Sequence, residues 1–269
     1  MVLIRTGRSM VSGKSSKAAR NTRASVVTKR STPWGTIVAV AVVVLFAVAI
    51  FGYAYVQNRA NSDEDAALAA FTPSAQNQDP STQIPGVLSQ PYTGGQHVTS
   101  DRQVAYTQSP PFGGAHDGFW AACNGVVYNT PVRNENLVHS LEHGAVWIAY
   151  NPDQVTGDAL AVLRDRVEGE SYIVMSPYPN LDSPVSLQSW GHQLKVGDVN
   201  DPRIDQFIQA LRLNQYQYPE VGATCDVGSG GGFDVDNPPP FVAAPAPGTP
   251  GAEPEAGAAP APVAPDAGR

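Results

Sequence analysis

Basic residues are scarce in most of this chain, and acidic residues are absent from its first segment. Residues 1–33 contain eight Lys or Arg and no Asp or Glu, whereas residues 60–269 contain all 24 acidic residues and only eight basic ones. The second region therefore lacks the positive surface that phosphate backbones require, which excludes nucleic acid as its partner. Such an uneven distribution also argues against one uniform soluble globule.

Charge is missing altogether from residues 35–56, a run of 22 residues that as a helix crosses the bilayer's hydrocarbon core of about 30 Å. Basic residues precede the run and acidic residues follow it, which by the positive-inside rule places the N-terminus in the cytoplasm. We therefore predict a single-pass protein of the cell membrane. It has a disordered basic leader over residues 1–33, a transmembrane helix over residues 34–56 in contact with the lipid bilayer, and an extracytoplasmic remainder. A cleavable signal peptide is the alternative, although its apolar core is normally shorter.

Large apolar side chains are rare at the other end of the chain. Ten of the 24 prolines lie between Pro238 and Pro265, and residues 226–269 consist largely of Gly, Ala and Pro. A segment of this composition cannot bury enough surface to offset the entropy of ordering it, so we predict a disordered tail. With residues 57–90 interpreted as a polar linker, the folded part is one extracytoplasmic domain over residues 91–225, which is an ordinary domain size.

Short elements of both kinds alternate along this domain. The apolar runs are rich in β-branched and aromatic residues, as buried strands are. The expected elements, in chain order, are a helix over 136–143 ended by Gly144, a strand over 145–150, a helix from Pro152 to residue 168, a strand over 171–176, two short strands or one broken strand around Gly191, and a helix opened by Pro202. This mixture indicates an α+β fold, a small mixed α/β sandwich-like domain.

Only two cysteines are present, Cys123 and Cys225, and both lie on the predicted extracytoplasmic side. Because that compartment permits disulfides, we expect a bond between them. It would close a loop of about a hundred residues, for which chain-entropy arguments give about 3–5 kcal/mol of stabilisation. The alternative is that Cys123 is a thiolate ligand of a metal and that Cys225 is unpaired.

All five histidines lie between residues 97 and 192. His139 and His143 are four residues apart in the expected helix, so their imidazoles project from one face and can meet at one cation. Glu142 borders that face and is a candidate ligand, ligand support or general base. His116 follows a Gly-Gly pair whose backbone freedom can bring it to the same place. The predicted site is a transition-metal centre for copper or zinc, held by His116, His139, His143 and Glu142.

His97 and His192 lie beside Gly and polar residues and are interpreted as surface residues. The segment HSLEH formally matches the inverted zinc-peptidase pattern, with Glu220 as a distant third ligand, but so short a pattern recurs by chance and the domain leaves little room for a peptide cleft. An electron-transfer copper site is excluded, because Met175 is the only Met of the domain and no Cys, His and Met fall together at loop spacing. Histidines that simply hydrogen-bond buried carbonyls are the structural alternative.

Three segments, PPFGGAHDGFW, CNGVVYNTPVRNENLVHSLEHGAVWIAYNPD and SPYPNLDSPVSLQSWG, resemble the actinobacterial family of domain of unknown function 3105. The resemblance covers about residues 95–215 and is most specific at VHSLEHGAVWI. Proteins of that family look similar throughout, with a short basic N-terminus, one membrane span and an extracytoplasmic domain. The family's hallmark residues fall at His116, Tyr128, Pro131, His139, Glu142, His143, Gly144, Trp147, Pro177, Tyr178 and Pro179.

The chain departs from that family pattern in two places. GGAH stands where the family more often has SGPH, and Asn124 separates Cys123 from Gly125, which weakens a ligand role for Cys123. The resemblance implies a shared site but no function, so three hypotheses follow from the residues. The first is a membrane-anchored domain that binds copper or zinc. The second is a hydrolase or other acid–base enzyme that uses Glu142, and the third is a non-catalytic envelope scaffold with a protein partner in the cell envelope and structural histidines.

Overall fold

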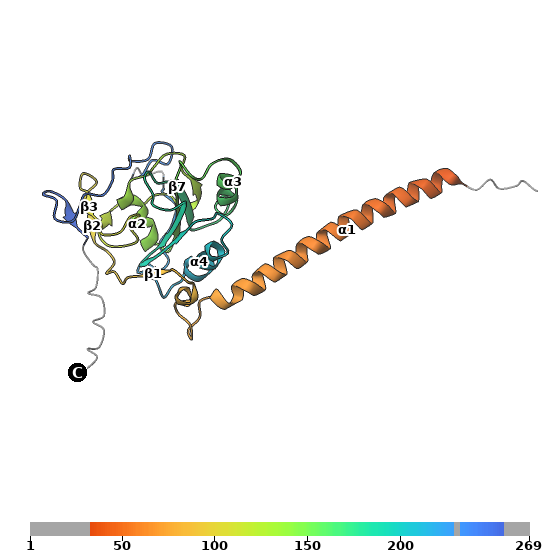
Figure 1. Ribbon diagram of the computed structural model, residues 1–269, viewed down its shortest axis with the longest axis horizontal. Helices are drawn as coiled ribbons and strands as arrows, with labels where there is room; N and C mark the ends of the chain where they lie inside the picture. The colour runs from red at the N-terminus through yellow and green to blue at the C-terminus, as the bar shows by residue number, and fades with distance from the viewer. Residues whose placement is uncertain (1–32, 229–231, 256–269) are drawn as a thin grey trace, which may run out of the picture. The chain divides into compact units, whose positions relative to one another are not determined.

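The protein is described here by a computed structural model that covers residues 33–228 and 232–255 (Figure 1). The chain divides into two compact units, one ending at Gln57 and the other beginning at Asn58. The first unit contains most of helix α1 (Trp34–Leu68). Within the described residues, one helical segment, Trp34–Arg59, is long and apolar enough by length and composition to cross a membrane, in line with the predicted helix over residues 34–56. The predicted leader lies outside the described residues except for residue 33.

The second unit is built on a six-stranded sheet in the order β1-β9-β8-β6-β7-β5. Strands β5, β6 and β7 run parallel, and the remaining neighbours pair antiparallel. The sheet strands are β1 (Leu88–Ser89), β5 (Asn124–Val127), β6 (Val146–Tyr150), β7 (Ile173–Pro177), β8 (Val185–Ser189) and β9 (His192–Val196). Two short strand pairs accompany the sheet: β2 (His97–Val98) with β4 (His116–Asp117), and β3 (Val104–Ala105) with β10 (Glu253–Pro254). The helices are α2 (Asn134–Glu142), α3 (Gly157–Asp165), α4 (Arg203–Leu211) and the short η1 (Ala69–Phe71) and η2 (Pro80–Gln83).

Alternate residues of the central strand β6 supply two separate apolar clusters, because successive side chains of a strand point to opposite faces. Trp147 packs in one cluster with Leu141 of α2. Ile148 packs in the other cluster with Leu163 of α3 and Phe207 of α4. The sheet is therefore covered by α2 on one face and by α3 and α4 on the other, which confirms the predicted α+β fold.

Most predicted elements are present, with shifts at their ends. The clearest difference concerns the helix expected from Pro152, which begins only at Gly157 and ends at Asp165. The preceding residues form a turn around Asn151, whose side chain accepts a hydrogen bond from the amide of Asp153 at 2.9 Å. An Asn side chain that binds the backbone in this way stabilises a turn in place of a first helical turn.

The predicted linker and tail are both wrong in part. Within residues 57–90, η2 and β1 pack on the second unit, and Ile84 belongs to the core with 3% of its surface exposed. Within residues 226–269, the described part 232–255 also lies on this unit, where Phe233 is buried and Phe241 packs against the core. Figure 1 shows this blue segment ending beside β3, and Glu255 accepts hydrogen bonds from Tyr92 and Thr107. Residues 256–269, where disorder was also predicted, lie outside the described residues.

The two cysteines form the expected disulfide, Cys123–Cys225. It joins positions 102 residues apart and ties the segment after α4 to the start of β5. The alternative of Cys123 as a thiolate metal ligand is therefore wrong.

Gly144 ends α2 and turns the chain into β6. Its φ is +92°, the left-handed conformation predicted for a glycine that ends a helix, and its amide donates to the carbonyl oxygen of Leu141. A Cβ built at this position would lie 2.7 Å from Cζ of Tyr218, so both the backbone and the available space require glycine.

We expect Gly144→Ala to lower the free energy of unfolding by about 1–3 kcal/mol, because alanine is strained at positive φ and collides with Tyr218. The midpoint of thermal unfolding of the full chain in detergent measures this. Gly197→Ala is the matched control, because no atom lies within 4 Å of a Cβ there and its φ is ordinary. Equal midpoints for the two variants would contradict the prediction.

Candidate metal centre

Three elements bring four potential ligands together. Strands β2 and β4 pair in parallel with His97 opposite His116, and α2 packs against β4 and supplies His139 and Glu142. One ligand atom of each of these four residues lies within 4.8 Å of the others, a set that we call the holding group. Ring centroids are 4.9 Å apart for His97 and His116, 4.9 Å for His97 and His139, and 4.8 Å for His116 and His139. The group therefore combines three imidazoles with one carboxylate.

Backbone carbonyls fix which ring nitrogen faces the group. Nδ1 of His116 donates to the carbonyl oxygen of Gly114 at 2.8 Å, and Nδ1 of His139 donates to that of Asp117 at 2.6 Å. A neutral imidazole has one N–H, so in both rings Nε2 carries a free lone pair. Fixing one nitrogen by an outer hydrogen bond is the usual way in which proteins orient a metal-binding histidine.

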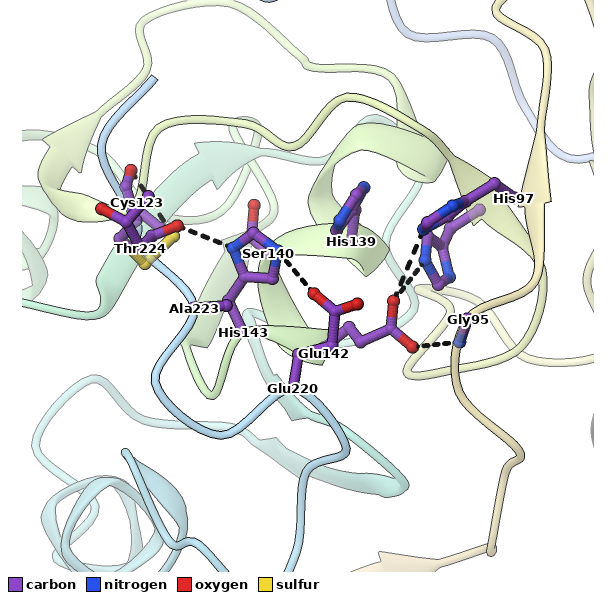
Figure 2. Close-up of polar contacts among 12 residues, drawn as sticks. Gly95, His97, Cys123, His139, Ser140, Glu142, His143, Glu220, Ala223 and Thr224 are labelled. Atoms are coloured by element: carbon purple, nitrogen blue, oxygen red, sulfur yellow. Dashed lines mark hydrogen bonds and ion pairs between the residues drawn. A yellow bond between two sulfur atoms is a disulfide. The ribbon is translucent and has the colours of Figure 1, made fainter. Parts of the chain in front are cut away.

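The carboxylate of Glu142 is held among these rings with no exposed side-chain area. Its Oε1 accepts a hydrogen bond from the amide of Gly95 at 2.5 Å, and its Oε2 lies 2.7 Å from Nε2 of His116 and 3.7 Å from Nε2 of His97 (Figure 2). A Cβ at Gly94 would lie 2.6 Å from Oε1, so the glycine is needed for the backbone to approach.

The contact between His116 and Glu142 needs a positive charge. Both Nε2 of His116 and Oε2 of Glu142 are buried without a hydrogen-bond partner of acceptable geometry. Two lone pairs facing each other at this distance repel unless a proton or a cation lies between or beside them. The donor set, imidazole nitrogen with carboxylate oxygen, is the set that binds first-row transition metals.

The electrostatics keep the neighbouring imidazole neutral. Burial, followed by the nearby imidazoles of His116 and His143, lowers the pKa of His139 to about 3. Burial also lowers the pKa of His143. Burial alone would raise the pKa of Glu142, but the contacts with His116 and the Gly95 amide outweigh it and hold that pKa below its ordinary value. A neutral imidazole beside an ionised carboxylate is the protonation state that a metal ion requires.

A second set of ligand atoms adjoins the first and consists of His139, His143 and Glu220, again within 4.8 Å of one another. We call it the transfer group. Nδ1 of His143 donates to the carbonyl oxygen of Thr224 at 2.7 Å, and its Nε2 lies 3.2 Å from Oε2 of Glu220. His139 thus belongs to both groups, as its central place in Figure 2 suggests.

The geometry changes the predicted ligand set. His116, His139 and Glu142 come together as expected, but His143 lies in the transfer group and not in the holding group. His97 is exposed, as the sequence indicates, but it is also a member of the holding group, which was not predicted. A signal for it was present, because GGQH ending at His97 repeats the GGAH that ends at His116, and the second glycine of each has positive φ, +75° and +91°.

Two further expectations are corrected. His192 is buried, with 3% of its surface exposed, because it lies in β9 and donates from Nδ1 to the carbonyl oxygen of Trp190. Glu220, discounted as a ligand on sequence grounds, lies beside His143 because its amide donates to the carbonyl oxygen of Glu142 at 3.2 Å. That backbone contact joins segments 78 residues apart, which no local pattern reveals.

Comparison with known proteins finds one family model that matches the part of the chain containing this site. Residues 97–227 match the family model described as protein of unknown function (DUF3105). The match covers the part of the chain in which the sequence resembles this family, and the matched residues include every member of the holding and transfer groups. No curated protein and no solved structure matches.

The metal-free chain should lose stability in acid partly through His139. The unfolded chain protonates this residue near its ordinary pKa of 6.5, whereas the folded protein keeps it neutral down to about pH 3. The unfolded state therefore binds more protons in this window, and stability present above pH 6.5 is lost as the pH falls. Thermal unfolding of the full chain in detergent with a chelator should show a flatter pH dependence for His139→Gln than for wild type. Parallel curves would contradict this assignment.

Proposed function

We propose that this protein is a membrane-anchored, extracytoplasmic domain that binds one transition-metal ion, copper or zinc, through His97, His116, His139 and Glu142. The observation that carries the proposal is the buried contact of Nε2 of His116 with Oε2 of Glu142 at 2.7 Å, in which neither atom has any other hydrogen-bond partner. A cation satisfies both atoms at once and uses the lone pairs that the Nδ1 hydrogen bonds leave on Nε2.

Three features support the location. The apolar segment Trp34–Arg59 is long enough to anchor the chain in a bilayer. The excess of Lys and Arg before it favours a cytoplasmic N-terminus. The disulfide Cys123–Cys225 fits an oxidising compartment on the other side.

The two other functions have weaker support. A hydrolase that uses Glu142 as general base needs a substrate or a water to reach the carboxylate, whose side chain is fully buried. Purely structural histidines would leave His116 and Glu142 as a buried ion pair, which accounts for these two residues but not for the gathering of His97 and His139 within 4.8 Å of them.

Metal binding by the full chain, purified in detergent without a polyhistidine tag, tests the proposal. We expect one Zn²⁺ or Cu²⁺ per chain in competition with a chelator, and a loss of affinity of about 100-fold or more in His139→Gln. A bound ion at about 100 times its dissociation constant should add about 2.7 kcal/mol of stability, so chelation should lower the midpoint of thermal unfolding.

His192→Gln is the matched control, because His192 is equally buried and its Nδ1 also donates to a backbone carbonyl, but it belongs to neither ligand group. It should bind the ion as wild type does. Wild-type protein that binds neither Zn²⁺ nor Cu²⁺, or His139→Gln protein with unchanged affinity, would refute the proposed function.

A further inference from the structure

The transfer group offers a metal ion a second place next to the first. It provides two imidazole nitrogens, from His139 and His143, and one carboxylate oxygen, from Glu220. The hydrogen bond from Nδ1 of His143 to Thr224 leaves Nε2 of that ring as the free lone pair, and Nε2 faces Glu220 at 3.2 Å. Two nitrogens and one oxygen are sufficient to hold a transition-metal ion that keeps a water or an outside ligand in its open position.

His139 can serve only one of the two groups at a time. Its Nδ1 is engaged by the carbonyl oxygen of Asp117, so the neutral ring has one lone pair to give, on Nε2. Ions in both groups would compete for that lone pair and would also repel each other across a distance of a few ångströms. The groups are therefore alternative positions for one ion and do not form a two-ion centre.

The rings lie in a row that an ion can follow in one short step. Ring centroids are 4.9 Å apart between His97 and His139 and 4.7 Å apart between His139 and His143. Figure 2 shows His139 between the other two. Since a metal–imidazole bond is about 2.0–2.1 Å long, an ion that keeps His139 can gain His143 before it has lost all of its first ligands.

The two groups reach solvent through different members. The side chains of His116 and Glu142 in the holding group have no exposed area, and its exposed member is the imidazole of His97, at 43%; the exposed member of the transfer group is the carboxylate of Glu220, at 39%. Glu220 is also fixed in place, because its amide donates to the carbonyl oxygen of Glu142 and the disulfide at Cys225 anchors the same segment. An anionic oxygen at a fixed, exposed position is where an ion would meet a ligand from outside the protein.

We propose that the ion moves between the holding group and the transfer group by way of the shared His139, and that a ligand outside the protein takes it from Glu220. The inference rests on the proposed function, since it needs an ion in the holding group. It makes the protein one that exchanges its metal ion with an acceptor, and not one that keeps the ion as a permanent structural part.

The rate at which excess chelator removes Zn²⁺ from the loaded full chain in detergent tests the exchange. Glu220→Gln should slow removal by about tenfold or more, because the amide lacks the charge that draws the ion to the transfer group. Glu142→Gln should speed removal, because it weakens the holding group. His192→Gln, outside both groups, should leave the rate as in wild type. Opposite effects of the two glutamate substitutions are the signature of exchange through a second position.

The alternative route leads past His97, whose side chain is 43% exposed. If the ion leaves that way, Glu220→Gln releases zinc at the wild-type rate, and if Glu220 is an ordinary ligand of the resting site, that variant releases zinc faster; either result overturns the exchange proposal. Two ions per chain at saturation would overturn it as well. A wild-type chain that takes up no ion gives a distinct result, which refutes the proposed function itself.

Discussion

The buried carboxylate of Glu142 is the constraint on which the arrangement of the site depends. An uncompensated charge in a protein interior costs several kcal/mol, so the surroundings must supply donors or positive charge. The amide of Gly95 provides one hydrogen bond, and His116 approaches the other oxygen at 2.7 Å. Gly94 has no side chain where one would collide with the carboxylate. The parallel β2–β4 pair and the helix α2 hold the imidazoles beside this carboxylate. They thereby offset the cost of burying its charge.

The same short motif, GGxH, places two of the histidines, His97 and His116. Each GGxH segment bends at a glycine of positive φ, enters a two-residue strand and presents its histidine opposite the other in register. The amide of His116 donates to the carbonyl oxygen of Gln96, which locks the two segments together. A pair of two-residue strands has little stability alone. Its packing against α2 therefore matters, because the same contact that stabilises the pair completes the ligand set.

The parts of the site that the sequence predicts are those set by local geometry. Spacing along α2 places His139 and Glu142 correctly, and Gly144 ends the helix as its position predicts. His143, however, is the C-cap residue, and its ring turns to the carbonyl oxygen of Thr224, which a helical-face argument does not foresee. The remaining features depend on contacts between segments far apart in the sequence, which no local pattern predicts. Examples are the position of Glu220 and the packing of residues 232–255. Residues 232–255 contain few large apolar side chains, but those present, such as Phe233, pack into the core and hold the segment on the domain.

The carboxylate of Glu255 accepts hydrogen bonds from the hydroxyl of Tyr92 and the amide of Thr107, both at 2.9 Å. Tyr92 lies just before the Gly94–Gly95 turn that reaches Glu142, so Glu255 supports the loop on which the site rests. The family match, over residues 97–227, includes neither that turn nor its brace. The residues that match the family model thus leave out Gly95, whose amide binds Glu142, and the residues that support its loop. A similar protein without a residue equivalent to Glu255 would need other contacts to hold the same loop in place.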